Sequence, residues 1–193
     1  MKRLFVFIFI SIFYCLCSSV PAQDIVLRGS VNYTVETARK MAFDGLDLKL
    51  DKKFIEPYAI DENNKENRDY IDKKKQPEGR MVMSFVMARG FVKGYAIVYD
   101  DKPEYVFYYT NGGYLIAIDI DKIQDKNTFP YKIGKYSAAT GNLVSIGFYV
   151  SDEEQYVYTK NGKLKAHWVG NTAYNEKGRP IATRDVSGEI PFD

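Results

Sequence analysis

Residues 104–120 read EYVFYYTNGGYLIAIDI, and this stretch decides the fold class. Two runs of aromatic and branched side chains, 104–110 and 114–120, flank the turn residues 111–113 (Asn-Gly-Gly). Tyrosine, valine and isoleucine favour strands because their side chains pack well on a half-buried pleated surface. Asparagine and glycine tolerate the backbone angles of a tight turn. The stretch therefore predicts an antiparallel hairpin.

The same alternation of apolar runs and turn signals extends over residues 81–184. Six further runs have this character: 81–87, 91–99, 131–137, 142–150, 155–159 and 163–169. Asn161-Gly162, between the last two, predicts a type I′ turn because both residues accept a positive φ. The pattern predicts a mainly β (β-rich α+β) protein, an antiparallel hairpin meander of about eight strands with one N-terminal amphipathic helix.

The segment before the meander contains that helix. In residues 34–46 apolar side chains recur at helical spacing and charged side chains take the opposite face. Gly45 is placed to end the helix. Leucines alternate with charged residues over 46–50, which predicts a short strand. We therefore expect residues 23–50 to form a helix and a short strand that cover one face of the sheet.

Two further segments are predicted to lie outside the sheet. Of the thirty residues at 51–80, sixteen are charged, with mixed signs and few apolar anchors. This composition predicts a charged loop or an exposed, poorly ordered helix. Residues 185–193 are expected to form a C-terminal tail.

The first 22 residues resemble a signal peptide in their order of parts. A short basic start and an apolar run over 4–17 are followed by small residues, which predicts cleavage between Ala22 and Gln23. An uncleaved membrane anchor would need roughly twenty apolar residues, and this run is shorter. A lipoprotein signal would need a small residue before the cysteine, whereas a leucine precedes Cys17.

Cleavage would change the composition of the working protein. Both cysteines, Cys15 and Cys17, leave with the leader, so no disulfide is expected in the mature chain. Lys2 and Arg3 leave as well, and 25 basic residues then balance 25 acidic ones. A neutral chain lacks the net basic field of nucleic-acid and anionic-membrane binders. We expect an extracytoplasmic protein, periplasmic or secreted, with no nucleic-acid partner and no membrane span; its oligomeric state stays open.

The hairpins also share a repeated frame. Each copy has a tyrosine, a few polar residues, a glycine, one further residue and then a leucine or isoleucine. The four copies are 108–115, 136–143, 158–164 and 174–181. Pro180 departs from this frame, because proline removes a ladder donor and suits an edge strand.

This frame resembles the bacterial MORN-variant and YD-type hairpin repeats, whose units read Y-x-x-x-G-x-L. The resemblance covers about residues 105–182. It implies stacked hairpins, and it implies no particular activity, because such repeats serve varied scaffold and binding roles.

No residue pattern indicates catalysis. The single histidine, His167, stands beside the single tryptophan in a predicted strand, where a structural role is typical. A mature chain without cysteine and with one histidine cannot build a Cys/His zinc site or a thiol nucleophile. Neither a G-x-S-x-G nucleophile elbow nor a glycine-rich phosphate loop occurs. We therefore expect no cofactor.

Two acidic stretches invite comparison with calcium sites. Asp119, Asp121 and Asp125 lie near a predicted turn, where a solvated turn is the expected role. The stretch 61–72 has acidic and amide residues at calcium-loop spacing, but a lysine replaces one ligand and no bidentate glutamate ends the loop. We expect no metal site.

Three hypotheses about function remain. The first is an exported, non-enzymatic β-sheet module that binds a protein, a glycan or the cell envelope. Its predicted contact surface is aromatic and comprises Tyr105, Phe107, Tyr109, Phe148, Tyr158 and Trp168. The alternative is an exported carboxylate-dependent hydrolase, which requires at least two acidic side chains converging in a pocket. An accessory domain docking a larger assembly through its helix or charged segment is a third reading.

Overall fold

The computed structural model describes residues 33–71, 76–87, 92–121 and 129–183. The predicted leader, with its cleavage site at Ala22 and Gln23, lies outside the described residues, as does the predicted tail at 185–193. In the part of the chain that is described, no helix is long and apolar enough to cross a membrane.

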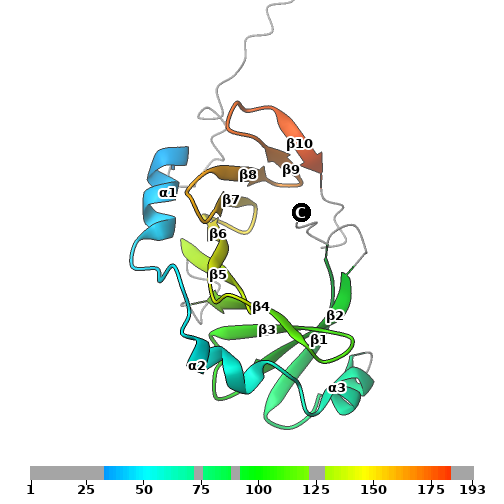
Figure 1. Cartoon of the computed structure of the whole chain (residues 1–193). Coiled ribbons are helices and arrows are strands. Elements are labelled where there is room, and N and C mark those ends of the chain that lie inside the picture. The colour runs from blue at the N-terminus through cyan, green and yellow to red at the C-terminus, as the bar shows by residue number, and fades with distance from the viewer. Residues whose placement is uncertain (1–32, 72–75, 88–91, 122–128, 184–193) are drawn as a thin grey trace, which may run out of the picture.

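Within the described residues, ten antiparallel strands form one sheet in which each strand pairs with its neighbours in sequence. The strands are β1 (Arg80–Met87), β2 (Val92–Tyr99), β3 (Tyr105–Thr110), β4 (Leu115–Asp121), β5 (Tyr131–Ser137), β6 (Leu143–Tyr149), β7 (Glu154–Thr159), β8 (Leu164–Val169), β9 (Thr172–Tyr174) and β10 (Pro180–Thr183). The predicted meander is confirmed, and the last copy of the repeated frame adds the hairpin β9–β10. Figure 1 shows the sheet bending into an open arch with β1 and β10 at its two ends.

The N-terminal part of the described chain follows the outer side of this arch (Figure 1). It contains α1 (Val35–Phe43), α2 (Lys52–Ile55), the 3₁₀ helix η2 (Glu56–Tyr58) and α3 (Asn64–Tyr70). At the start of α1 the Thr34 hydroxyl accepts a hydrogen bond from the Thr37 N–H, which caps the helix. The helix buries Ala38 and Ala42, so the predicted amphipathic helix is confirmed.

The sequence predicts a charged loop or an exposed, poorly ordered helix at 51–80, and the described part of this segment contains short helices. These helices, α2, η2 and α3, all lie within residues 51–71, and Asn67 in α3 is only 1% exposed. The Asn67 amide donates to Asp61 Oδ2 at 2.8 Å and accepts from Arg80 Nε at 2.7 Å. The Tyr95 hydroxyl also donates to Asp61. Hydrogen bonds between polar side chains order the segment. Such bonds cannot be predicted from the numbers of charged and apolar residues alone.

The strand predicted at 46–50 is reduced to a single bridge between Lys49 and Asn142. This bridge belongs to a longer segment, residues 44–61, which we call the strap. The strap runs from the end of α1 past α2 and touches the turn ends of two hairpins. It is therefore a connection along the sheet rather than a strand within it.

Two backbone hydrogen bonds hold the strap at each contact. At β5–β6 the Leu50 N–H donates to the Gly141 carbonyl at 2.8 Å, and the Leu143 N–H donates to the Leu48 carbonyl at 2.9 Å. The equivalent bonds at β3–β4 run from the Asp61 N–H to the Gly113 carbonyl, 2.8 Å, and from the Leu115 N–H to the Ala59 carbonyl, 3.0 Å. The strap thus makes the same pair of backbone hydrogen bonds with two copies of the repeated hairpin frame.

Four hairpins end their turns on the same kind of residue, although the β5–β6 turn is one residue longer than the other three, because the Gly141 N–H donates to the carbonyl of Ser137, four residues back. A glycine with left-handed backbone ends each turn: Gly113 (φ 81°), Gly141 (φ 71°), Gly162 (φ 76°) and Gly178 (φ 69°). In β7–β8 the Gly162 N–H bonds to the Thr159 carbonyl, so Lys160 and Asn161 are the central residues of a four-residue turn. The hairpin is as predicted, but the two-residue type I′ turn is not, because Gly162 follows the central residues instead of being one of them.

A register shift accompanies each of these turns. It lies next to Tyr109, Tyr136, Tyr158 and Pro180 in the four hairpins. In each case the register skips one residue of the second strand: Ile116, Val144, Lys165 and Ile181. Pro180 pairs with Tyr174 as the leucines pair with their tyrosines, so Pro180, and not Ile181, is the fourth member of that position.

The core lies between the sheet and its N-terminal cover. Tyr109, Tyr136 and Tyr158 are at most 1% exposed. The Tyr136 hydroxyl donates to the Asp47 carbonyl in the strap at 2.6 Å, and the Tyr158 hydroxyl donates to the Val35 carbonyl in α1 at 2.8 Å. A tyrosine can therefore fill the core with its ring and still satisfy its hydroxyl on the covering backbone.

Candidate functional site

The six aromatic side chains predicted as a contact surface are mostly core residues. Phe107 and Tyr158 are 0% exposed, Tyr109 1%, Phe148 3% and Trp168 4%, and Tyr105 packs half-buried against the same core. Trp168 belongs to a separate cluster with Val157 and Ala173. The predicted aromatic surface is wrong, because strand alternation does not reveal which face of the sheet a helix and strap will cover.

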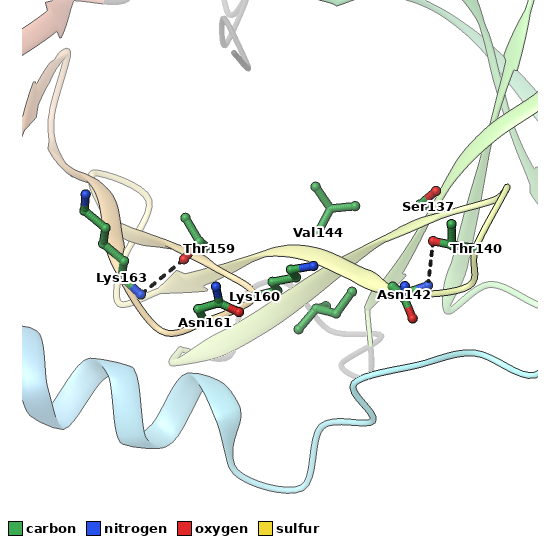
Figure 2. A pocket seen from close by; sticks show the side chains of 9 residues that line it. Ser137, Thr140, Asn142, Val144, Thr159, Lys160, Asn161 and Lys163 are labelled. Atoms are coloured by element: carbon green, nitrogen blue, oxygen red, sulfur yellow. Dashed lines mark hydrogen bonds between the residues drawn. The ribbon is translucent and has the colours of Figure 1, made fainter.

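A groove instead opens between the turns of two neighbouring hairpins, β5–β6 and β7–β8. Its volume is about 630 Å³. The lining residues are Ser137, Thr140, Asn142, Leu143, Val144, Thr159, Lys160, Asn161 and Lys163. Figure 2 shows Ser137, Val144 and Thr159 pointing away from the N-terminal segment. The groove is therefore accessible from the side that the strap leaves uncovered.

The repeated turn frame builds this groove. Val144 is the β6 residue that the register skips, and it is 47% exposed. The Lys160 N–H donates to the Val144 carbonyl at 3.2 Å, which ties one turn to the next. Within β7–β8 the Thr159 hydroxyl accepts from the Lys163 N–H at 3.2 Å. The walls are thus fixed by backbone bonds while side chains remain directed into the opening.

The groove is cationic and rich in neutral polar groups. Lys160 and Lys163 supply two ammonium groups, and none of the nine lining residues is acidic. Three hydroxyls and two amides offer both donors and acceptors. Neither aromatic nor histidine side chains line it. This set can hold an anionic ligand that carries hydroxyl groups, and it contains no evident acid–base or nucleophilic machinery.

His167 lies in a buried network away from this groove. Its Nε2 lies 2.9 Å from Glu154 Oε1, and their side chains are 1% and 5% exposed. The imidazole stacks on Tyr156 with ring centroids 4.0 Å apart. The Tyr156 hydroxyl donates to the Tyr33 carbonyl at 2.8 Å and lies 3.1 Å from Glu154 Oε1. A histidine so enclosed cannot touch a substrate, so we assign it a structural role.

The acidic residues of β4 lie on the inner face of the sheet, opposite the core. The Tyr108 hydroxyl donates to Asp119 Oδ2 at 2.8 Å, and Lys135 Nζ lies 2.8 Å from Asp119 Oδ1. Burial, and next the Asp119 charge, raise the pKa of Tyr108, so its hydroxyl keeps its proton. Asp121, two residues on, is on the same face and buried. Asp119 already interacts with the Lys135 ammonium group and the Tyr108 hydroxyl, so Asp119 and Asp121 do not form an available acid–base pair. The hydrolase hypothesis stays a prediction.

The stretch 61–72 uses its polar residues to fold, as far as it is described. Asp61 accepts the Asn63 N–H at 3.0 Å at the start of α3. Asn64 donates to the Tyr95 hydroxyl at 2.8 Å. Among the residues that the structure describes, no three His, Cys, Asp or Glu side chains are grouped as a metal site; Asp125 lies outside them.

Comparison of the chain with protein-family models, with curated proteins and with solved structures finds no match. The resemblance to bacterial hairpin repeats therefore stays a prediction.

Sequence reasoning missed the groove residues although it singled out their turns. The copies 136–143 and 158–164 are the two walls, and consecutive hairpins in a meander are neighbours in space. That adjacency, with Lys160 and Lys163 in one turn, was a usable signal. The exposure of Val144 was not, because it depends on the register shift.

Proposed function

We propose that the protein is an exported, non-enzymatic binding module that holds an acidic glycan in the groove between the β5–β6 and β7–β8 turns. The observation that carries this proposal is the lining itself, two lysines among hydroxyl and amide side chains with no acidic residue. Export is the prediction from the leader sequence.

The chemistry of the lining favours a glycan over a peptide strand. Sugar hydroxyls donate and accept hydrogen bonds at once, as the Ser, Thr and Asn side chains of the groove do. An extended peptide would instead need unpaired backbone groups. At this rim the turn backbone is already bonded, with the Ser137 N–H on the Asn142 carbonyl at 2.9 Å and the Thr159 N–H on the Lys163 carbonyl at 2.8 Å.

The acidic character of the ligand follows from Lys160 and Lys163. Carboxylates on successive sugars would meet ammonium groups in charge-assisted hydrogen bonds. Because the groove is open to solvent, salt should screen this attraction and weaken binding.

The test uses the mature chain and a short uronic acid oligosaccharide, a trigalacturonate, in calorimetric titration. The Lys160→Gln/Lys163→Gln double variant should lose at least about tenfold in affinity, since each charged hydrogen bond contributes about 1.5–3 kcal/mol before solvent screening. Lys177→Gln in the β9–β10 turn is the matched control: it is exposed, lies in the equivalent turn and is not part of the groove.

The control should bind as the unmodified chain does, and the neutral trisaccharide of the same linkage should bind more weakly. Absence of binding to the trigalacturonate contradicts the proposal. If the groove variant and Lys177→Gln lose the same affinity, the loss reflects net charge alone, and the proposal is contradicted as well.

A further inference from the structure

The position after each turn glycine forms a row along the hairpin ends. Its four members are Tyr114, Asn142, Lys163 and Arg179. All four side chains are exposed, although the residue that follows each of the first three is a leucine packed on or in the core. The repeated turn therefore presents one outward side chain per hairpin.

Two members of this row, Asn142 and Lys163, line the groove. Equivalent positions in consecutive hairpins are two strands apart, which is about 9–10 Å. Tyr114 stands one such step beyond Asn142, on β3–β4. A linear ligand that leaves the groove along the turns would meet Tyr114 next.

Tyr114 combines an exposed side chain with a backbone that is fixed by hydrogen bonds. Its side chain is 62% exposed, and its bridge partner in the strap, Ile60, is 61% exposed. The Tyr114 N–H donates to the Thr110 hydroxyl at 3.2 Å, and the strap bonds the residues on both sides of it. The ring lies close over Gly112, where a Cβ would come within 3.3 Å. An aromatic ring on so fixed a backbone loses little freedom when it binds.

We propose that Tyr114 is a second contact for the same glycan, stacking its ring on the apolar face of a sugar one hairpin step from the groove. This inference rests on the proposed function, because the groove supplies the first contact. It adds that the ligand is a linear polymer which crosses the hairpin ends, with its carboxylates at Lys160 and Lys163 and a sugar ring on Tyr114.

The experiment compares a short with a long ligand, trigalacturonate and a galacturonate of about nine sugars. The mature chain should bind the long ligand more tightly per chain than the short one. Tyr114→Ala should weaken binding of the long ligand by about 3- to 10-fold, the size expected of one aromatic contact, and leave the short ligand unchanged. Tyr114→Phe should bind both as the unmodified chain does, because stacking needs the ring and not the hydroxyl.

Ile181→Ala is the matched control, an exposed apolar side chain of 51% exposure on β10, beside the last turn of the row. It should bind both ligands normally. If Tyr114→Ala binds the long ligand as tightly as the unmodified chain, the second contact is overturned while the groove stands. If the unmodified chain binds neither length, the proposed function fails and this inference fails with it. If only a polyglutamate peptide binds and does so through Tyr114, the glycan is replaced by an acidic peptide and the inference is overturned.

Discussion

The hairpins β5–β6 and β9–β10 share one turn frame and differ in what covers them. In β5–β6, Tyr136 and Leu143 are each 1% exposed beneath the strap. In β9–β10 the corresponding pair is Tyr174, half-buried, and Pro180, exposed. Equivalent positions of one repeated frame are thus a core residue in one hairpin and a surface residue in the other.

The residue at the leucine position shows why the last hairpin differs. The Leu143 N–H donates to the strap at Leu48. Pro180 has no N–H to offer, and β10 is the edge of the sheet. Proline at a sheet edge removes a donor that could recruit another strand. The frame is therefore adapted in the last hairpin, whose second strand is the edge of the sheet.

The largest expected effect is unfolding of the covered hairpins at alkaline pH. Burial raises the pKa of Tyr109 and Tyr158, and it raises the pKa of Tyr136 to about 12 from 10.0. A group with a raised pKa stabilises the fold below its ordinary pKa and loses that contribution as the pH rises through the folded value. We expect the free energy of unfolding to be steady below pH 10.0 and to fall steeply above it.

Urea unfolding at successive pH values checks this expectation, with tyrosinate absorbance followed in parallel. The buried tyrosines should ionise together with unfolding, in one cooperative step. If all tyrosines ionise near pH 10.0 while the chain remains folded, the tyrosines are not buried beneath α1 and the strap, and this expectation is contradicted.

Truncation of one branched apolar side chain in each hairpin should separate the two hairpins next. Leu143→Ala removes a side chain from the covered core and should lower the free energy of unfolding by about 2–5 kcal/mol. Ile181→Ala, at a residue 51% exposed in β10, should change it by about 0.5 kcal/mol or less. Urea denaturation of both variants measures the contrast, and equal losses would show that β9–β10 is covered as well.

The turn glycines allow a smaller contrast between two covered hairpins. Gly141 and Gly162 have φ of 71° and 76°, so alanine is strained at both. At Gly141 a Cβ would lie 2.6 Å from the Leu50 carbonyl of the strap, whereas at Gly162 it would lie 3.2 Å from the movable Arg39 side chain. Gly141→Ala should therefore cost about 1–3 kcal/mol more than Gly162→Ala, an overpacking term. Equal urea midpoints would mean that the strap is not seated against this turn.

Much of this architecture could be predicted from local sequence. The period-two runs and turn glycines suffice for the meander, because each strand pairs only with its neighbours in sequence. The helix at 34–46 was equally legible from its spacing. The hairpin frame even marked the residues at 174–181 as a further copy, although not as two further strands.

What could not be predicted depends on which face is covered. Alternation marks Phe107 and Tyr109 as lying on one face, yet the same pattern would describe an exposed aromatic platform. Their burial follows from the strap, whose attachment uses backbone bonds and buried polar groups such as Asp61 and Asn67. The groove has a similar origin, because Val144 is exposed by a register shift that depends on backbone geometry.

The smallest expected contrast concerns a single hydroxyl and tests the strap most directly. The Tyr136 hydroxyl donates to the Asp47 carbonyl at 2.6 Å, so Tyr136→Phe deletes a buried bond between sheet and strap. The loss should be about 0.5–1.5 kcal/mol, since a buried hydrogen bond is partly offset by the water bonds of the unfolded chain. Tyr174→Phe makes the same chemical change in β9–β10, where the side chain is half-buried, and should be nearly neutral.

Hydrogen exchange at the Leu50 and Leu143 amides is a second measurement of the same contact, because only Tyr136→Phe should speed it. Equal stability of the two variants, with unchanged exchange, would mean that the backbone bonds alone hold the strap and that the covered tyrosines contribute through their rings.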